Sequence, residues 1–196
     1  MAAPTTFRAY QYGNYGDLRH ELQLRSDVPM PQLQSTHVRI RVHAAALNPC
    51  DPGLIEQWGF MLTGRTPSKD VPFGFGLDAS GTVVEVGSAV TGGLQVGDAV
   101  FAMAPFSEFG TAAEYIAIDA QLVARKPVTL SFEQAAGVPL TALTSHQMLF
   151  EHAKLQTGER VLILGGSTAT GIFAIQLAKA AGAYVIATAS PRNMAF

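Results

Sequence analysis

The spacing of apolar and polar residues divides the chain into two parts with different periodicities. Up to about residue 127, short alternating runs are separated by glycine and proline. In residues 36–47, Val38, Ile40 and Val42 point to one side of a strand, and the basic residues between them, beginning with Arg39, point to the other. Further strands are expected at residues 81–87, 96–103, 112–118 and 122–124. Many short strands with frequent turn signals predict a small β-barrel.

The pattern becomes helical at Ser131. Ser131 followed three residues later by Gln134 resembles a capping box, and the helical pattern runs to about residue 154 with an interruption at 137–139. A strand, a helix and a second strand are expected next, at residues 160–164, 170–181 and 184–188. Elements in this order form a right-handed βαβ unit. We therefore predict an α/β chain, with a β-barrel domain at residues 1–127 before the first part of a doubly wound dinucleotide-binding domain at residues 128–196.

Composition narrows the classes of function. Of the 196 residues, 48 % are apolar and 14 % are charged, and the formal net charge is -2, which is typical of a globular protein. Lys and Arg are scattered, which argues against nucleic-acid binding. Residues 134–150 and 161–178 carry no charge, but glycine or proline interrupts both, so no membrane span is expected. The single cysteine, Cys50, excludes an internal disulfide and a four-thiolate zinc site. We expect a soluble, cytoplasmic protein.

A glycine-rich turn joins the strand at 160–164 to the helix that follows. It reads Gly165-Gly166-Ser167-Thr168-Ala169-Thr170-Gly171. Such a turn lets backbone N–H groups approach a pyrophosphate, and the positive end of the helix adds attraction. Gly166 and Gly171 fit the G-x-G-x-x-G pattern, whereas Thr168 replaces its middle glycine and restricts the approach. The hydroxyls of the turn can compensate by donating hydrogen bonds. A plain strand–helix connection is the alternative interpretation.

The end of the second strand bears on the choice of cofactor. An NAD-binding unit usually carries an acidic residue there, which holds the ribose 2′-hydroxyl. Residues 187–193 contain no acid, whereas Ser190 and Arg192 suit a 2′-phosphate. The sequence therefore favours NADPH over NADH, the alternative being an ordinary polar loop with a solvated arginine.

Several motifs, taken in order, resemble those of a known family. They are Asn48-Pro49-Cys50-Asp51, the glycine–aspartate strand at 76–87, the hairpin at 96–100 and the helix entry at 139–144. Together they resemble the zinc-independent, quinone oxidoreductase-like branch of the medium-chain dehydrogenase/reductase superfamily. The resemblance covers nearly the whole chain.

The resemblance implies a GroES-like β-barrel domain followed by a Rossmann domain, with NADPH in the cleft between them. It implies that Asn48 faces the nicotinamide end, that Asp51 fixes its loop and that Thr144 approaches the cofactor. The turn at 165–171 would cradle the pyrophosphate, and the residues after the second strand would read the 2′-phosphate. Simpler alternatives remain: Asn48 and Asp51 cap the following helix, and Thr144 is a buried helix hydroxyl.

Departures from related zinc enzymes indicate that no metal is bound. Leu77 stands where those relatives carry a histidine, which leaves Cys50 without an essential partner for zinc. The histidines at 43, 146 and 152 are interpreted as structural or solvated. Some enoyl-thioester reductases of the superfamily place a tyrosine just beyond the Asn-Pro-x-Asp loop, but here the sequence is Trp58-Gly59-Phe60. That absence counts against this subgroup.

Our hypothesis is hydride transfer from NADPH to a quinone or an α,β-unsaturated carbonyl compound. Asn48 is the candidate donor to the developing enolate oxygen. The alternatives are an enoyl-thioester reductase and, from another class, a non-catalytic nucleotide-binding or interaction module. Because related enzymes continue beyond the second Rossmann strand, we expect the chain to be truncated within that domain, with catalytic activity uncertain. A homodimer that completes the sheet is the other possibility.

Overall fold

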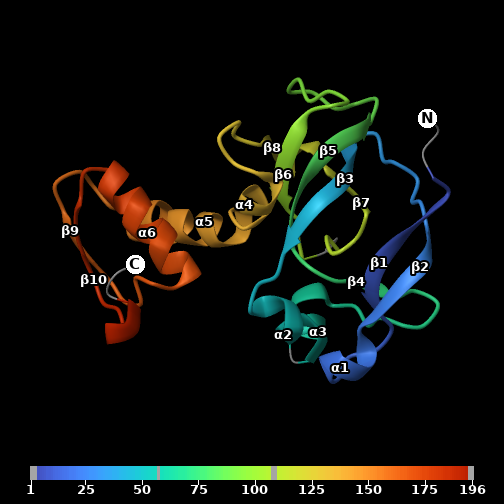
Figure 1. The fold of residues 1–196 in the computed structure, drawn as a ribbon, viewed down its shortest axis with the longest axis horizontal. Helices are drawn as coiled ribbons and strands as arrows, with labels where there is room; N and C mark the ends of the chain where they lie inside the picture. Colours follow the sequence, from blue (N-terminus) through green and yellow to red (C-terminus); the bar gives the residue numbers. More distant parts are fainter. Residues whose placement is uncertain (1–3, 57, 107–109, 194–196) are drawn as a thin grey trace. The chain divides into compact units, whose positions relative to one another are not determined.

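The computed structural model describes residues 4–56, 58–106 and 110–193. The chain forms two compact units, Met1–Gly137 and Val138–Phe196 (Figure 1). The first unit is mostly β-structure and the second is a βαβ unit preceded by a helix.

Two antiparallel sheets form the first unit, with strand orders β7-β3-β5-β6-β8 and β2-β1-β4. The strands are β1 (Thr6–Tyr12), β2 (Gln23–Pro29), β3 (His37–Ala46), β4 (Phe73–Gly74), β5 (Asp78–Val86), β6 (Ala99–Met103), β7 (Tyr115–Asp119) and β8 (Val123–Arg125). The connecting helices are α1 (Leu18–Glu21), α2 (Cys50–Glu56), α3 (Gly59–Thr63) and η1 (Ala120–Leu122). The strands predicted from alternation are present, and β5 begins three residues earlier than predicted, at Asp78.

The apolar face predicted for β3 lies in a core. Val38 and Ile40 are almost fully buried and pack in one cluster with Val83 of β5 and Val100 of β6. Burying an aliphatic side chain of this size contributes about 1.5–3 kcal/mol. A second cluster contains Tyr12 of β1, Ile55 of α2, Phe73 of β4 and Phe75.

The opposite face of β3 differs from a simple polar surface. Arg39 lies on it as predicted, yet its residue exposure is only 4 %. Its Nε donates to Glu85 Oε2 at 2.8 Å, and a terminal nitrogen donates to the Pro31 carbonyl at 2.8 Å. These partners offset part of the cost of removing the guanidinium from water. The alternating pattern predicted the face of β3 on which Arg39 lies. It did not predict that the segment containing Pro31 contacts this face.

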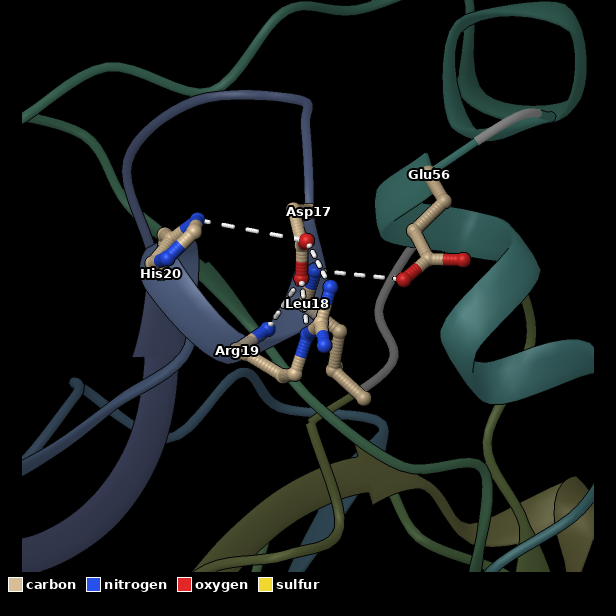
Figure 2. A network of polar contacts seen from close by, with 5 residues as sticks. All are labelled: Asp17, Leu18, Arg19, His20 and Glu56. Carbon is tan, nitrogen blue, oxygen red and sulfur yellow. Dashed lines mark hydrogen bonds and ion pairs between the residues drawn. The ribbon is translucent and has the colours of Figure 1, made fainter.

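A small polar network joins α1 to the end of α2 (Figure 2). Asp17 precedes α1, and its carboxylate accepts from the Arg19 backbone N–H at 2.9 Å and from the Arg19 side chain at 2.6 Å. The Leu18 backbone N–H donates to Glu56 Oε1 at 3.2 Å. The guanidinium and the N–H of Arg19 hold the pKa of Asp17 well below its usual range. The network therefore gives hydrogen-bond acceptors to backbone N–H groups at the start of α1 and connects α1 to α2.

The first unit also includes α4 (Phe132–Ala136). Ser131 caps this helix, and both hydrogen bonds of the predicted capping box with Gln134 are present. The helix packs against β3 and β5, so the compact first unit runs to Gly137. The domain boundary expected from the sequence after residue 127 stays a prediction.

The second unit begins with α5 (Pro139–His146), which continues as the π-helical turn η2 (Gln147–His152). It then contains β9 (Arg160–Ile163), α6 (Ala169–Ala180), β10 (Tyr184–Ala187) and η3 (Pro191–Asn193). Strands β9 and β10 pair in parallel, and α6 packs against both (Figure 1). The predicted order of strand, helix and strand is therefore present.

The two uncharged stretches belong to separate short elements. Of the helices in the described ranges, none has both the length and the apolar character needed to cross a bilayer.

Candidate functional site

Asn48, Asp51 and Asp78 form a buried polar cluster in the first unit. The Asn48 backbone N–H donates to Asp51 Oδ2 at 2.6 Å, and the Asn48 Nδ2 donates to Asp78 Oδ2 at 3.1 Å. All three residues are at most 8 % exposed. The Asp51 carboxylate thus supports the start of α2, in line with the simpler capping interpretation. The Asn48 side chain does not cap α2, because it reaches across to β5.

Burial controls the acid–base properties of this cluster. Asp51 is fully buried, and its Oδ1 has no hydrogen-bond partner in the described structure. Burial raises the pKa of Asp51, while the Asn48 N–H acts in the opposite direction. Burial also raises the pKa of the neighbouring Cys50 thiol, with a smaller contribution from the charge of Asp51. Cys50 is therefore a poor nucleophile in this environment.

Replacing Asp51 with Asn should reduce a pH dependence of stability. Because burial raises the pKa of Asp51, the folded chain keeps this proton at pH values where the unfolded chain has released it. The contribution of Asp51 to the free energy of unfolding is therefore largest below its ordinary pKa. It is lost as the pH rises through the raised value. As the pH rises above about 4, the ordinary pKa of an aspartate, the free energy of unfolding should fall less in Asp51→Asn than in the wild type. Urea unfolding followed by the fluorescence of Trp58 measures this.

Asp98→Asn is the control variant, because Asp98 should change the pH dependence of the free energy of unfolding in the opposite direction. The backbone N–H of Gln95, with help from Arg125, lowers the pKa of Asp98. Asp98 therefore contributes stability above its ordinary pKa and loses it as the pH falls. Equal pH slopes in the wild type and Asp51→Asn would contradict the assigned effect of burial.

The glycine-rich turn between β9 and α6 is closely packed. Gly165 has φ +76°, a conformation that favours glycine. A Cβ on Gly166 would lie 2.8 Å from the Ala187 Cβ, and a Cβ on Gly171 would lie 2.2 Å from the Gly165 carbonyl oxygen. The turn is also tied to the end of β10, because the Gly166 N–H donates to the Thr188 carbonyl at 2.7 Å. At Gly166 and Gly171, the two glycines that fit the predicted fingerprint, the neighbouring atoms therefore leave no room for a side chain.

Thr168 caps the start of α6, a role that the sequence pattern did not indicate. Its Oγ1 donates to the Gly165 carbonyl at 2.7 Å and accepts from the Gly171 N–H at 3.0 Å, which makes Thr168 the N-cap of α6. Its hydrogen is therefore engaged inside the turn. Within the described part of the chain, the backbone N–H groups of Ala169 and Thr170 find no acceptor. These groups lie at the positive end of α6.

Thr144 and its neighbour Ser145 lie on α5. Thr144 is half-buried, and its hydroxyl bonds to the Leu140 carbonyl at 2.7 Å, which agrees with the simpler helix interpretation. Ser145 is 1 % exposed, and its Oγ lies 2.8 Å from the Thr170 carbonyl oxygen. Ser145 therefore fastens α5 to the first turn of α6. This role of Ser145 could not be predicted from the sequence, because a contact between residues 25 positions apart leaves no local pattern.

A hollow lies beside the glycine-rich turn, and two residues of the segment after β10, Ala189 and Asn193, contribute to its lining. Ser190 and Arg192 are exposed, and Arg192 has no ion-pair partner among the described residues. Asn193 Nδ2 donates to Ser167 Oγ at 3.0 Å, which brings η3 against the turn. A cavity of about 350 Å³ lies here, lined by residues of the turn, α6, the end of β10 and Asn193. Asn193 follows Arg192 directly in the sequence, but no motif there indicated its contact with the turn.

The histidines and carboxylates do not gather into a metal centre in the parts of the chain that are described. No three His, Cys, Asp or Glu side chains come close enough there to share an ion. His43 stacks on Phe132 with ring centroids 4.3 Å apart, and its Nε2 lies 3.0 Å from Thr82 Oγ1. His146 and His152 are exposed on their helix.

A tyrosine lies where the local sequence shows none. The Tyr15 ring packs against Gly59, since a Cβ on Gly59 would be 2.2 Å from Tyr15 Cε1. Its hydroxyl donates to the Arg65 carbonyl at 2.6 Å. Tyr15 is more than forty residues away from Gly59 in the sequence, so only the fold brings its ring there.

The first unit also carries a larger apolar groove. Its volume is about 690 Å³, and its lining comes mainly from β1, the start of β2 and the end of β3, including Leu24 and Leu47. The ion pair between Arg8 and Glu114, 2.6 Å long, lies at the same groove. No sequence motif indicated this groove.

Comparisons with known proteins agree with this architecture. Residues 34–128 match the alcohol dehydrogenase GroES-like domain family. The NADPH-dependent alkenal/one oxidoreductase, chloroplastic, of Arabidopsis thaliana is 37% identical over 97% of this chain and 50% of its own length. The structure of the quinone oxidoreductase from Coxiella burnetii has a TM-score of 0.82 at 36% identity, covering 97% of this chain and 59% of that one. The CurK enoyl reductase structure has a TM-score of 0.82 at 31% identity, covering 98% and 57%.

The chain belongs to the medium-chain dehydrogenase/reductase superfamily, and within it to the zinc-independent, quinone oxidoreductase-like branch. The predicted fold class, a GroES-like barrel domain followed by part of a Rossmann domain, is confirmed. The chain spans about half the length of the curated relatives that it matches.

Proposed function

We propose that this chain is part of an NADPH-dependent reductase that transfers hydride to a quinone or an α,β-unsaturated carbonyl compound. The observation that carries the proposal is the turn between β9 and α6. Its glycines allow close approach at Gly166 and Gly171. The N–H groups of Ala169 and Thr170, at the start of the 12-residue helix α6, have no acceptor among the residues that the structure describes. This donor set suits a pyrophosphate.

The residues of the second unit fit a phosphorylated dinucleotide. When bound, NADPH supplies the hydride, so the protein needs mainly to bind and orient. Ser167 accepts a hydrogen bond from Asn193 and keeps its own hydrogen for a phosphate oxygen. Arg192 and Ser190 are exposed and lie in the sequence between Ala189 and Asn193, which line the hollow. Their side chains suit a 2′-phosphate, which distinguishes NADPH from NADH.

The first unit supplies a candidate donor for the substrate. Hydride addition to the β-carbon of an enone leaves charge on the carbonyl oxygen, which a fixed N–H stabilises. Asn48 gives one Nδ2 hydrogen to Asp78 and keeps the other for such an oxygen. Its low exposure leaves little access for competing water.

Arg192→Ala should weaken the binding of NADPH about 10- to 100-fold and leave that of NADH unchanged, since a charge-assisted pair contributes about 1.5–3 kcal/mol. Fluorescence titration of the purified chain with each nucleotide measures both constants. Lys179→Ala, which removes an exposed charge at the far end of α6, is the matched control. Equal binding of both nucleotides by the wild-type chain would contradict the assignment of NADPH.

An enoyl-thioester reductase is the second candidate, since the fold matches the CurK enoyl reductase and Tyr15 lies against Gly59. Consumption of NADPH with enones, quinones and enoyl thioesters separates the two reductases. Binding without turnover of any acceptor would favour a non-catalytic nucleotide-binding module. A cytoplasmic location and a homodimer stay predictions.

A further inference from the structure

The carboxamide of Asn48 is fixed by a partner thirty residues away in the sequence. Its Nδ2 donates to Asp78 Oδ2 at 3.1 Å, and both side chains are buried. We propose that Asp78 is a positioning residue, which sets the orientation in which Asn48 presents its amide to the carbonyl oxygen of a quinone or enone substrate. This inference rests on the proposed reductase function.

The chemistry of the two groups sets the direction of the amide. A carboxylate oxygen only accepts hydrogen bonds, whereas an amide has a donating and an accepting end. The nitrogen of Asn48 must therefore face Asp78, and Oδ1 must point elsewhere. The second Nδ2 hydrogen then has a defined direction, because the amide is planar. Without Asp78, the amide can rotate and present its oxygen to a substrate oxygen, which is repulsive.

The backbone around Asp78 makes this partner rigid. Asp78 begins β5, which lies between β3 and β6 in the larger sheet. It pairs with Ala46 on one side and Met103 on the other, and it is only 1 % exposed. Ala46 is two residues before Asn48, so the same ladder places both partners. A site supported by a central strand is held more closely than one supported by a loop.

Asp51, in the same cluster, binds the backbone of Asn48 and not its side chain. It accepts from the backbone N–H of Asn48, so it holds the position of the chain and leaves the side chain free to rotate. Asp78 alone among these groups contacts the Asn48 carboxamide. The loss of turnover caused by removing Asp78 should therefore arise through Asn48. That loss should be absent in a variant that already lacks the Asn48 side chain.

A double-mutant cycle tests this dependence. Asp78→Asn keeps the volume, but the new amide either accepts from or donates to Asn48, so the orientation is no longer fixed. We expect kcat for an enone to fall about 10- to 100-fold with KM for NADPH unchanged, as for other losses of orientation. In the Asn48→Ala background, Asp78→Asn should cause no further loss. An equal loss in both backgrounds would show that Asp78 acts independently of Asn48 and would overturn the proposal. Ser80→Ala, two residues along β5, is the matched control with wild-type kcat expected.

A second measurement does not depend on turnover. The side-chain amide signals of Asn48 in a nitrogen–proton correlation spectrum are identified by their loss in Asn48→Ala. Asp78→Asn should shift both amide protons and speed their exchange with water, whereas Ser80→Ala should leave them in place. If Asp78→Asn leaves these signals unmoved, Asp78 does not orient Asn48. If they shift but the wild-type chain reduces no acceptor, the orienting contact stands and the reductase function fails.

Discussion

Gly81→Ala should strongly destabilise the first unit. A Cβ on Gly81 would lie 2.1 Å from the Arg41 carbonyl oxygen and 2.8 Å from Ile40 Cγ2. Gly81 pairs with Val42 on one side and Val100 on the other, so β5 cannot move away from one neighbour without disturbing the next. Overpacking of this kind costs about 3 kcal/mol when backbone atoms must shift.

Urea unfolding measures this cost. Trp58 is the single tryptophan and lies in the first unit, where its ring packs over Gly53. Its fluorescence therefore reports the unfolding of this unit. Gly137→Ala is the matched control, because its φ is -78° and the nearest atom to an added Cβ is 3.6 Å away. Its free energy of unfolding should change by less than about 1 kcal/mol. A midpoint for Gly81→Ala equal to that of the control would contradict the predicted clash.

Local sequence signals predicted the parts of the fold whose cause is local. The alternation in β3 arises because every second side chain enters the core, as Val38 and Ile40 do. The capping box needs only Ser131 and Gln134, three residues apart. The strand β2 was not predicted individually, because it is mostly exposed along its length and shows no clear alternation. The strand β1 was not predicted either, although its buried positions alternate with exposed ones over most of its length.

The candidate site was only partly predictable for the same reason. The family motif identified Asn48 and Asp51, which are neighbours in the chain. The contact that fixes the Asn48 side chain comes from Asp78, and only the pairing of β3 with β5 brings it close. In the glycine-rich turn, the sequence suggested that Thr168 restricts the approach of a phosphate and that its hydroxyl can compensate. The structure uses its hydroxyl as the helix cap, so the departure from the fingerprint has a local structural function.

Gly171→Ala should abolish or strongly weaken the proposed dinucleotide binding. An added Cβ would lie 2.2 Å from the Gly165 carbonyl oxygen, 2.9 Å from the Gly166 Cα and 2.9 Å from Thr168 Oγ1. These atoms form the turn itself, so the start of α6 must move away from it. Moving the helix by a few tenths of an ångström breaks the Thr168 cap, which contributes about 1 kcal/mol, and misdirects the N–H groups of Ala169 and Thr170. We expect the affinity for NADPH to fall at least about tenfold, which corresponds to about 1.4 kcal/mol.

The readout must separate lost binding from lost folding, because the same clash affects both. Far-ultraviolet circular dichroism of Gly171→Ala at low temperature, where the second unit remains folded, shows whether α6 is retained. Titration with NADPH under those conditions then measures binding alone. Lys179→Ala alters the exposed end of the same helix and should bind as the wild type does. If Gly171→Ala keeps both its helix and wild-type affinity, the turn between β9 and α6 is not where the pyrophosphate binds. The connection would then be a structural one, and the nucleotide would have to contact other residues.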